Sequence, residues 1–198
     1  MARTIARDHD EKRRQILKTA ARVFARDGVD RASMNQVAAA CGISKANIYH
    51  YYASKNALLF DILDSHLCSL RDRICAIRPE GRSPEEQFRE TLCEILLAYE
   101  GADDEHRVQA SGLGALPPAQ QNILRDYQRD MVRHMSDILC RLAPDRFFHD
   151  GAKLRAVTMS VFGMLNWFYM WNARANAQER ESYCRLVADL TLGGIHRT

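Results

Sequence analysis

Residues 33–59 read SMNQVAAACGISKANIYHYYASKNALL, and this stretch decides the fold of the first third of the chain. Ser33 and Gln36 have the spacing of a capping box, in which each side chain bonds to the other residue's backbone N–H. The box predicts a short helix from Met34 to about Ala40.

Gly42 ends this helix, and Ser44 has the side chain and position of a cap for a second short helix that runs to about Tyr51. A further cap, Ser54, opens a long helix over residues 55–77, whose apolar residues recur at helical spacing. Two short helices joined by a glycine turn form a helix-turn-helix.

Upstream, apolar residues at helical spacing predict a helix from about Asp8 to Asp27, which Gly28 ends, with Asp8, Asp10 and Glu11 in its first turn. Residues 1–66 carry 11 Lys and Arg against 7 Asp and Glu, and the remainder carries 17 against 18. The positive charge is therefore concentrated near the N-terminus. Two interpretations fit: a surface for a polyanion such as DNA, or a solvated basic face.

The second helix of a helix-turn-helix enters the major groove and reads base edges with its N-terminal residues. Lys45 can donate to guanine and Asn47 can pair with adenine, while small Ala46 allows close approach. The candidate DNA-binding residues are Ser33, Ser44, Lys45, Ala46, Asn47, Tyr49, His50, Tyr51 and Lys55. The alternatives are that Lys45 and Lys55 are simply solvated and that one of Tyr51 and Tyr52 packs inside, since neighbouring residues on a helix point about 100° apart.

The same stretch resembles the DNA-binding module of the TetR family of bacterial regulators. That family shows a capped helix, an alanine-rich stretch, Gly-Val/Ile-Ser, Tyr-x-His/Tyr-Phe/Tyr and a Ser/Asp-Lys-x-x-Leu helix start. The matching positions are Val37, Ala38, Gly42, Ile43, Ser44, Ile48, Tyr49, Tyr51, Tyr52, Lys55 and Leu58. The similarity covers roughly residues 12–66, and it departs at Ala46-Asn47, where many members carry glycine or proline before a small residue.

The resemblance implies an all-α fold of about nine helices, with a ligand pocket in a C-terminal bundle and a dimer interface formed by the last two helices. The composition agrees, because glycine (10) and proline (5) are scarce and strand-like runs are few. We expect a helix-turn-helix DNA-binding domain over residues 1–54 and a ligand-binding and dimerisation domain over 55–198. The dimer face is expected in residues 156–173 and 179–192, where Ala156 and Gly163 would let a facing helix approach closely.

A small-molecule effector is expected in the second domain, because large apolar side chains there recur at spacings of three to four on two helical segments. The candidate ligand-binding residues are Tyr127, Met131, Met164, Trp167 and Phe168. For each of them, ordinary core packing is the alternative. The closing stretch, from FGMLNW at residues 162–167 through ADLTLGG at residues 188–194, also resembles family members that sense acyl-coenzyme A thioesters. The phosphates of such a ligand would then meet Arg125, Arg129 or Arg133.

We expect no cofactor and no metal, because the six cysteines form no C-x-x-C pair and the seven histidines lack ligand spacing. The cysteines are interpreted as small apolar residues in a reducing compartment, although Cys68 and Cys75, seven apart, leave a redox or metal role open. Residues 1–14 are polar and charged, so no signal peptide is expected and the protein is predicted to be cytoplasmic. Residues 156–173 carry no charge, but their polar interruptions favour a buried helix over a membrane span.

Two other protein classes compete with a regulator. A helix-bundle enzyme would have to use His134, Asp130, Glu94 or Ser160, and no catalytic spacing links these residues. A helical interaction module would leave the basic N-terminus without a use. We therefore predict a homodimeric transcriptional repressor, not an enzyme, that a small, largely apolar ligand releases from a palindromic DNA operator.

Overall fold

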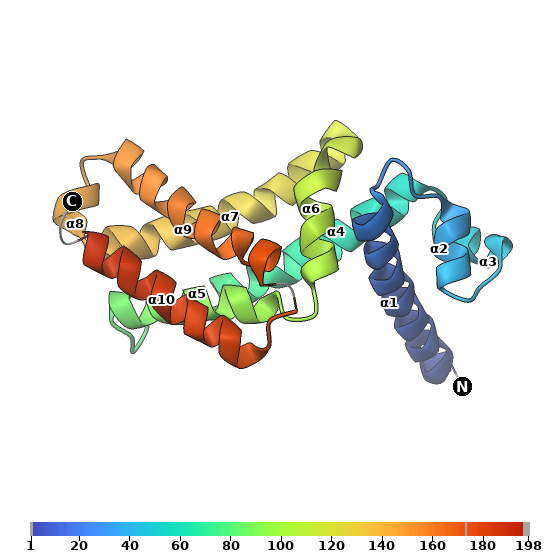
Figure 1. Ribbon diagram of the computed structural model, residues 1–198, viewed down its shortest axis with the longest axis horizontal. Helices are drawn as coiled ribbons and strands as arrows, with labels where there is room; N and C mark the ends of the chain where they lie inside the picture. The colour runs from blue at the N-terminus through green and yellow to red at the C-terminus, as the bar shows by residue number, and fades with distance from the viewer. Residues whose placement is uncertain (1, 173, 196–198) are drawn as a thin grey trace. The chain divides into compact units, whose positions relative to one another are not determined.

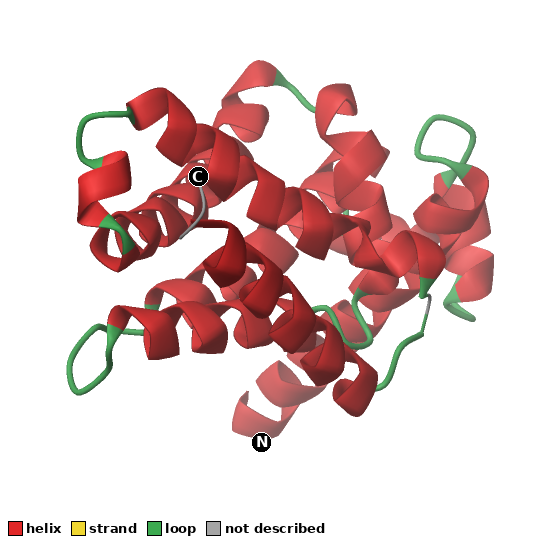
Figure 2. Ribbon diagram, turned by 60° about the vertical axis from the view of Figure 1, so that its left-hand side comes forward, coloured by secondary structure: helices red, strands yellow, loops and turns green. Residues whose placement is uncertain are grey.

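The computed structural model describes residues 2–172 and 174–195, and within them the chain forms α-helices, one 3-10 turn and no strand (Figures 1 and 2). The all-helical prediction is therefore confirmed. The helices are α1 (Ala2–Asp27), α2 (Met34–Ala40), α3 (Lys45–Tyr51), α4 (Lys55–Cys75), α5 (Pro84–Ala98), α6 (Asp103–Gly112), α7 (Pro118–Leu142), α8 (Pro144–Phe147), α9 (Gly151–Trp171) and α10 (Ala177–Ile195). Among the described residues, none of the helices combines the length and apolar character that crossing a membrane requires.

Helix α1 starts earlier than its sequence pattern predicts, at Ala2 instead of about Asp8. Residues 2–7 contain neither glycine nor proline, so nothing in them stops the helix from extending. The first turn consequently carries no acidic residue, and the expected stabilisation of the helix dipole by Asp8, Asp10 and Glu11 in that turn is wrong. The C-terminal end is as predicted, because Gly28 adopts a positive φ of 83° just after Asp27.

The predicted helix caps are confirmed in atomic detail. The backbone N–H of Ser33 donates to Gln36 Oε1 over 2.8 Å, and the Gln36 N–H donates back to Ser33 Oγ over 3.3 Å. Ser44 Oγ accepts from the N–H of Asn47 at 3.2 Å, and Ser54 caps α4 in the same way. These local bonds set where α2, α3 and α4 begin.

The chain divides into two compact units, Met1–Leu67 with Asp104–Arg125, and Cys68–Asp103 with Asp126–Thr198. In the first unit, α2 packs against both α1 and α3. Its core collects apolar side chains from α1, α2, α3 and the first half of α4: Ile16, Ala20, Phe24, Val37, Ile48, Leu58, Leu59 and Leu63. The predicted functional boundary between residues 54 and 55 remains a prediction.

The sequence showed no row of apolar residues at helical spacing in the segment that forms helix α6. This helix also belongs to the first unit, from Asp104 onward. A Cβ at Gly112 would lie 3.1 Å from Val29 Cγ2 and 3.2 Å from Leu59 Cδ1, so the small residue permits close packing there. His66 of α4 and His106 of α6 meet edge to face, with ring centroids 6.4 Å apart. Burial, and secondarily the charge of His106, lower the pKa of His66 from 6.5 to about 4.

This depressed pKa gives a testable pH dependence. The folded state disfavours protonation of His66, so its contribution to stability is complete above pH 6.5 and is lost as the pH falls toward 4. At about 1.4 kcal/mol per pKa unit, the loss amounts to at most about 3 kcal/mol. Urea unfolding from pH 7 to pH 4 should show a smaller pH-dependent loss in His66→Gln than in the original chain. Equal losses in both proteins would exclude His66 as the source.

In the second unit, α10 packs against α5 and α9, and α5 also contacts α9 (Figure 1). The buried side chains include Phe88, Leu92, Ile95, Ile138, Leu139, Val161, Leu165, Cys184 and Val187. Two pairs of polar groups lie within this core: Tyr99 donates to Asn166 Oδ1 at 2.8 Å, and the hydroxyls of Ser136 and Thr158 lie 3.0 Å apart. Satisfied polar pairs of this kind fix which helix faces meet.

Candidate nucleic-acid interface

Helix α3 presents its N-terminal residues outward because one side of the helix is fixed in the core. Ile48 is fully buried, whereas Lys45, Ala46 and Asn47 are exposed in the first turn after the Ser44 cap. Gly42, with a φ of 64°, makes the tight turn that leads from α2 into α3. The predicted base-reading residues therefore share the free end of one short helix, which is the geometry that major-groove entry requires.

The aromatic residues that end α3 have different roles. Tyr49 and His50 are exposed, so both retain donors for a backbone phosphate. Tyr51 is half-buried and stacks on His9 of α1 with centroids 5.0 Å apart. Tyr52 is buried and its hydroxyl donates to Asp61, which answers the alternative left open above: Tyr52 packs inside.

Asp61 is a residue that the sequence did not single out. Its carboxylate accepts from Tyr52 and also from Arg13 of α1, so it joins α1, the end of α3 and α4. Burial, and then the hydrogen bond to Asp61, raise the pKa of Tyr52 above its ordinary value. Arg13 is one of the basic residues near the N-terminus, and its guanidinium is paired with Asp61 within this module.

Lys55 is also engaged within the chain. Its ammonium group donates to the backbone carbonyls of Val29, Asp30 and Ala32, at 2.7, 3.0 and 3.0 Å. An ammonium has three N–H groups, and these three acceptors use all of them. We therefore assign Lys55 to the architecture of the module rather than to a phosphate contact.

Exposed basic side chains also lie along α1. Arg14, Lys18 and Arg22 follow one another at intervals of four residues, so they lie on one face of the helix, and all three are exposed. With Glu11, Gln15 and Thr19 they line a shallow depression of about 600 Å³. Ser33, also predicted at the interface, is exposed, but its side chain is used as the α2 cap.

The predicted ligand residues lie in the second unit, on α7 and α9, in different environments. Met131 and Phe168 are buried, and Met164 and Tyr127 are half-buried, with the Arg71 guanidinium 4.9 Å from the Tyr127 ring centroid. Trp167 is 62% exposed. The structure thus places Phe168 in the core and its neighbour Trp167 on the surface.

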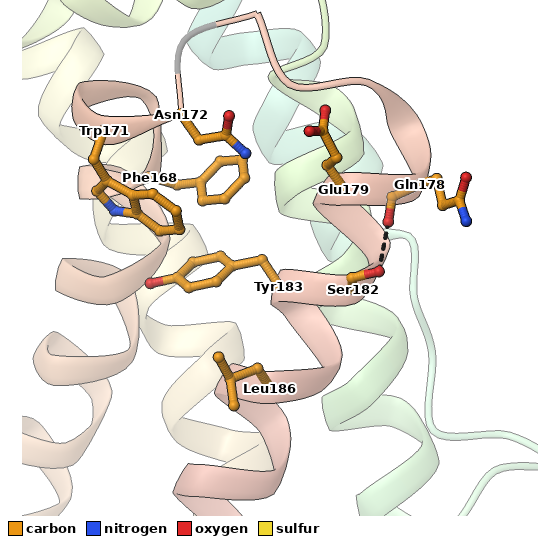
Figure 3. Close-up of a pocket in the computed structure, with 8 residues that line it drawn as sticks. All are labelled: Phe168, Trp171, Asn172, Gln178, Glu179, Ser182, Tyr183 and Leu186. Carbon is orange, nitrogen blue, oxygen red and sulfur yellow. Dashed lines mark hydrogen bonds between the residues drawn. The ribbon is translucent and has the colours of Figure 1, made fainter.

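A pocket of about 410 Å³ lies between α9 and α10 (Figure 3). The rings of Phe168 and Tyr183 stack with centroids 4.6 Å apart, and Trp171 meets the Tyr183 ring edge-on at 5.2 Å. Glu179 and Asn172 lie near one end and Leu186 near the other. Of the five predicted ligand residues, only Phe168 lines this pocket.

The pocket opens onto a broader apolar face. Large apolar side chains are exposed on α9 and α10: Met159, Trp167, Met170, Trp171, Leu186 and Leu190. Gly163 lies on the same stretch of α9, and a Cβ added there would meet nothing within 4 Å. Several large exposed apolar side chains on two neighbouring helices are typical of an interaction site. Ala173, the last residue of the predicted α9 segment, lies outside the described residues.

Three arginines of α7 that were candidates for phosphate binding have acceptors on their own helix. Arg125 donates to Gln121 over 2.7 Å, Arg129 to Asp126, and Arg133 to Asp130 over 3.4 Å. In the described residues, no group of three or more His, Cys, Asp and Glu is arranged to hold a metal ion.

Comparison with known proteins gives two family matches. The model for "Bacterial regulatory proteins, tetR family" matches residues 16–62, and the model for "Tetracyclin repressor-like, C-terminal domain" matches residues 81–195. A transcriptional regulator of the same family from Bordetella parapertussis is 32% identical, with a TM-score of 0.85 over 91% of this chain and 93% of that one.

Two further comparisons cover different shares of the chain. The Bacillus subtilis HTH-type regulator YuxN is 37% identical over 82 residues, which are 41% of this chain and only 28% of YuxN. The structure of AibR in complex with isovaleryl coenzyme A and operator DNA is 22% identical, with a TM-score of 0.76 over 90% of this chain and 97% of AibR. At that identity the likeness to AibR shows a shared fold.

Proposed function

The chain belongs to the TetR family of bacterial regulatory proteins, and on this basis we propose that it is an effector-responsive repressor that binds a near-palindromic operator as a homodimer. Members of the family are DNA-binding transcription factors, so the regulator class is confirmed over the enzyme and the interaction module. Operator sequence, effector and repression belong to the proposal.

The observation that carries the DNA-binding part is the arrangement of α3. Lys45, Ala46 and Asn47 are exposed at the capped end of a helix whose Ile48 is fully buried. A rigidly held helix can offer these side chains to base edges in a fixed register. Arg14, Lys18 and Arg22 on α1, with Tyr49 and His50 on α3, supply candidate partners for phosphates.

The apolar face of α9 and α10 supports the homodimer. A second copy of the chain would cover the exposed tryptophans and leucines, and Gly163 would admit a crossing helix, since nothing of its own chain occupies that space. Two copies would present their α3 helices about one DNA turn, ~34 Å, apart on the operator. Because the aromatic pocket of Figure 3 opens onto this face, we assign it to the dimer contact.

The dimer proposal gives a sharp test at Gly163. Gly163→Arg should leave the monomer folded, because the added side chain meets only open space in its own chain. In the dimer it would bury an unpaired charge, which should weaken association at least tenfold. Sedimentation equilibrium measures this, with Gly114→Arg, at another open position in the first unit, as the matched control. A dimer as tight as the original would place the interface elsewhere.

For the effector, we propose a small, largely apolar molecule, with acyl-coenzyme A thioesters as the first class to examine. The large side chains of Tyr127, Met131 and Met164 support an apolar site, and AibR, which shares the fold, was crystallised with isovaleryl coenzyme A. The phosphates of such a ligand would replace the intrahelical acceptors as the partners of Arg125, Arg129 and Arg133.

One experiment tests the whole proposal. Duplexes selected from a random pool are titrated with the protein at two salt concentrations, and binding of the selected sequence should weaken steeply as salt rises. Acyl-coenzyme A thioesters and the free acids are then added to the complex. Release of DNA by the thioester supports the effector class, release by the acid alone shifts it to carboxylic acids, and failure to select any sequence contradicts the proposed function.

A further inference from the structure

A disulfide between Cys93 and Cys184 joins α5 to α10 across 91 residues of sequence, with the two Cα atoms 5.2 Å apart. This corrects the expectation that these two cysteines are free apolar residues. Cys184 is buried and Cys93 is half-buried. The other four cysteines, Cys41, Cys68, Cys75 and Cys140, are free and half-buried.

The bond lies in the middle of the contact that holds α10 in place. On one side of it, the buried Arg180 reaches the Leu96 carbonyl at 3.4 Å. On the other side, Arg89 and Asp189 form an ion pair at 2.8 Å. The buried face of α10 carries Cys184, Val187, Ala188 and Thr191.

The opposite side of α10 carries Leu186 and Leu190, which are exposed and belong to the proposed dimer face. In the described residues, the disulfide is the one covalent link between α10, which presents Leu186 and Leu190 of that face, and another helix. A constraint that limits the motion of an interface element before association lowers the entropic cost of association.

We propose that Cys93 and Cys184 are a site of reversible oxidation by hydroperoxides, and that the oxidised form dimerises and binds operator more tightly than the reduced form. The coupling to DNA rests on the proposed function. The oxidation of the two sulfurs is independent of the proposed function.

The chemistry needs only a hydroperoxide. Cys93, the less buried thiol, attacks the terminal peroxide oxygen as its thiolate, forms a sulfenic acid and releases an alcohol, or water when the oxidant is hydrogen peroxide. Cys184 then attacks the sulfenic sulfur, forms the S–S bond and releases water. Two thiols and one peroxide thus give one disulfide, one alcohol and one water, and a dithiol reverses the bond by exchange.

Both the oxidised and the reduced form should be folded. The disulfide would therefore regulate the protein and would not be required for its folding. The interface of α5 with α10 has its own apolar core, including Leu92, Ile95 and Val187. Closing so long a loop should nevertheless raise Tm, by about 10 °C at the usual loop entropy for a chain of this size.

The experiment compares the full chain after treatment with dithiothreitol or with hydrogen peroxide. Alkylation of the unfolded protein followed by mass spectrometry should count six thiols in the reduced form and four in the oxidised form. The oxidised form should melt about 10 °C higher, dimerise about tenfold more tightly by sedimentation and bind selected operator more tightly by a similar factor.

Cys93→Ser and Cys184→Ala, each alone, should remove the response to peroxide, and Cys140→Ser should keep it. Six reactive thiols after peroxide treatment would overturn the proposal, and so would a dimer affinity that is the same in both redox forms. If neither form binds any duplex, the proposed function fails, while the thiol count and the dimer affinity still decide the redox inference.

Discussion

Replacing Lys45 or Asn47 with alanine is expected to weaken operator binding by about 1 to 3 kcal/mol per half-site, or about 2 to 6 kcal/mol for a dimer on two half-sites. Both side chains are exposed at the capped start of α3 and contribute nothing to the core, so the loss should appear in DNA affinity alone. Fluorescence anisotropy with the selected operator and a scrambled duplex measures it. Sequence preference should relax along with affinity.

Lys55→Met is the control for this experiment, because it also removes one cation from the module. It should lower Tm, since three carbonyls of residues 29–32 lose their donor. Lys45→Ala should leave Tm unchanged. If Asn47→Ala reduces binding to operator and scrambled DNA equally, Asn47 contacts the backbone and the assignment of base reading to it is wrong.

Replacing Arg180 with methionine is expected to lower the free energy of unfolding by about 3 to 5 kcal/mol. Arg180 is 1% exposed, and its guanidinium donates to the carbonyls of Ala175 and Leu96 and to Asp103, at 3.0, 3.4 and 3.0 Å. Methionine fills similar space but leaves all three acceptors without this donor. Urea denaturation followed by circular dichroism measures the change.

The matched control is Arg185→Met on the same helix. The Arg185 side chain is exposed, and its ion pair with Glu181 spans 3.9 Å, so its loss should cost well under 1 kcal/mol. A loss for Arg180→Met as small as that of the control would mean that water or neighbouring groups satisfy the three acceptors, and that the buried guanidinium is not an anchor of α10.

The parts of the fold that the sequence predicted are those determined by neighbours in the chain. Ser33, Gln36, Gly42 and Ser44 act on residues three or four positions away, and α2 and α3 begin and end where these residues indicated. Helix α6 is short and ends in small and polar residues, so its packing against α4 left no periodic signal to read.

The parts that the sequence missed depend on residues distant in the chain. The partners of Lys55 are 23 to 26 positions upstream, and Cys184 is 91 positions from Cys93. The Phe168 ring stacks on Tyr183, which is 15 positions away on another helix. Pattern alone does not carry that information, because it describes one helix at a time.

The bonds of Lys55 also determine how the first unit can respond to a signal. The first turn of α4 is fastened to the loop that follows α1 by three short, charge-assisted bonds. Asp61, one turn and a half further along α4, holds Arg13 of α1 and Tyr52 at the end of α3. Tilting the start of α4 would therefore move α1 and α3 together with it. An effector would then change the angle of the recognition helix α3 without changing the conformation of that helix.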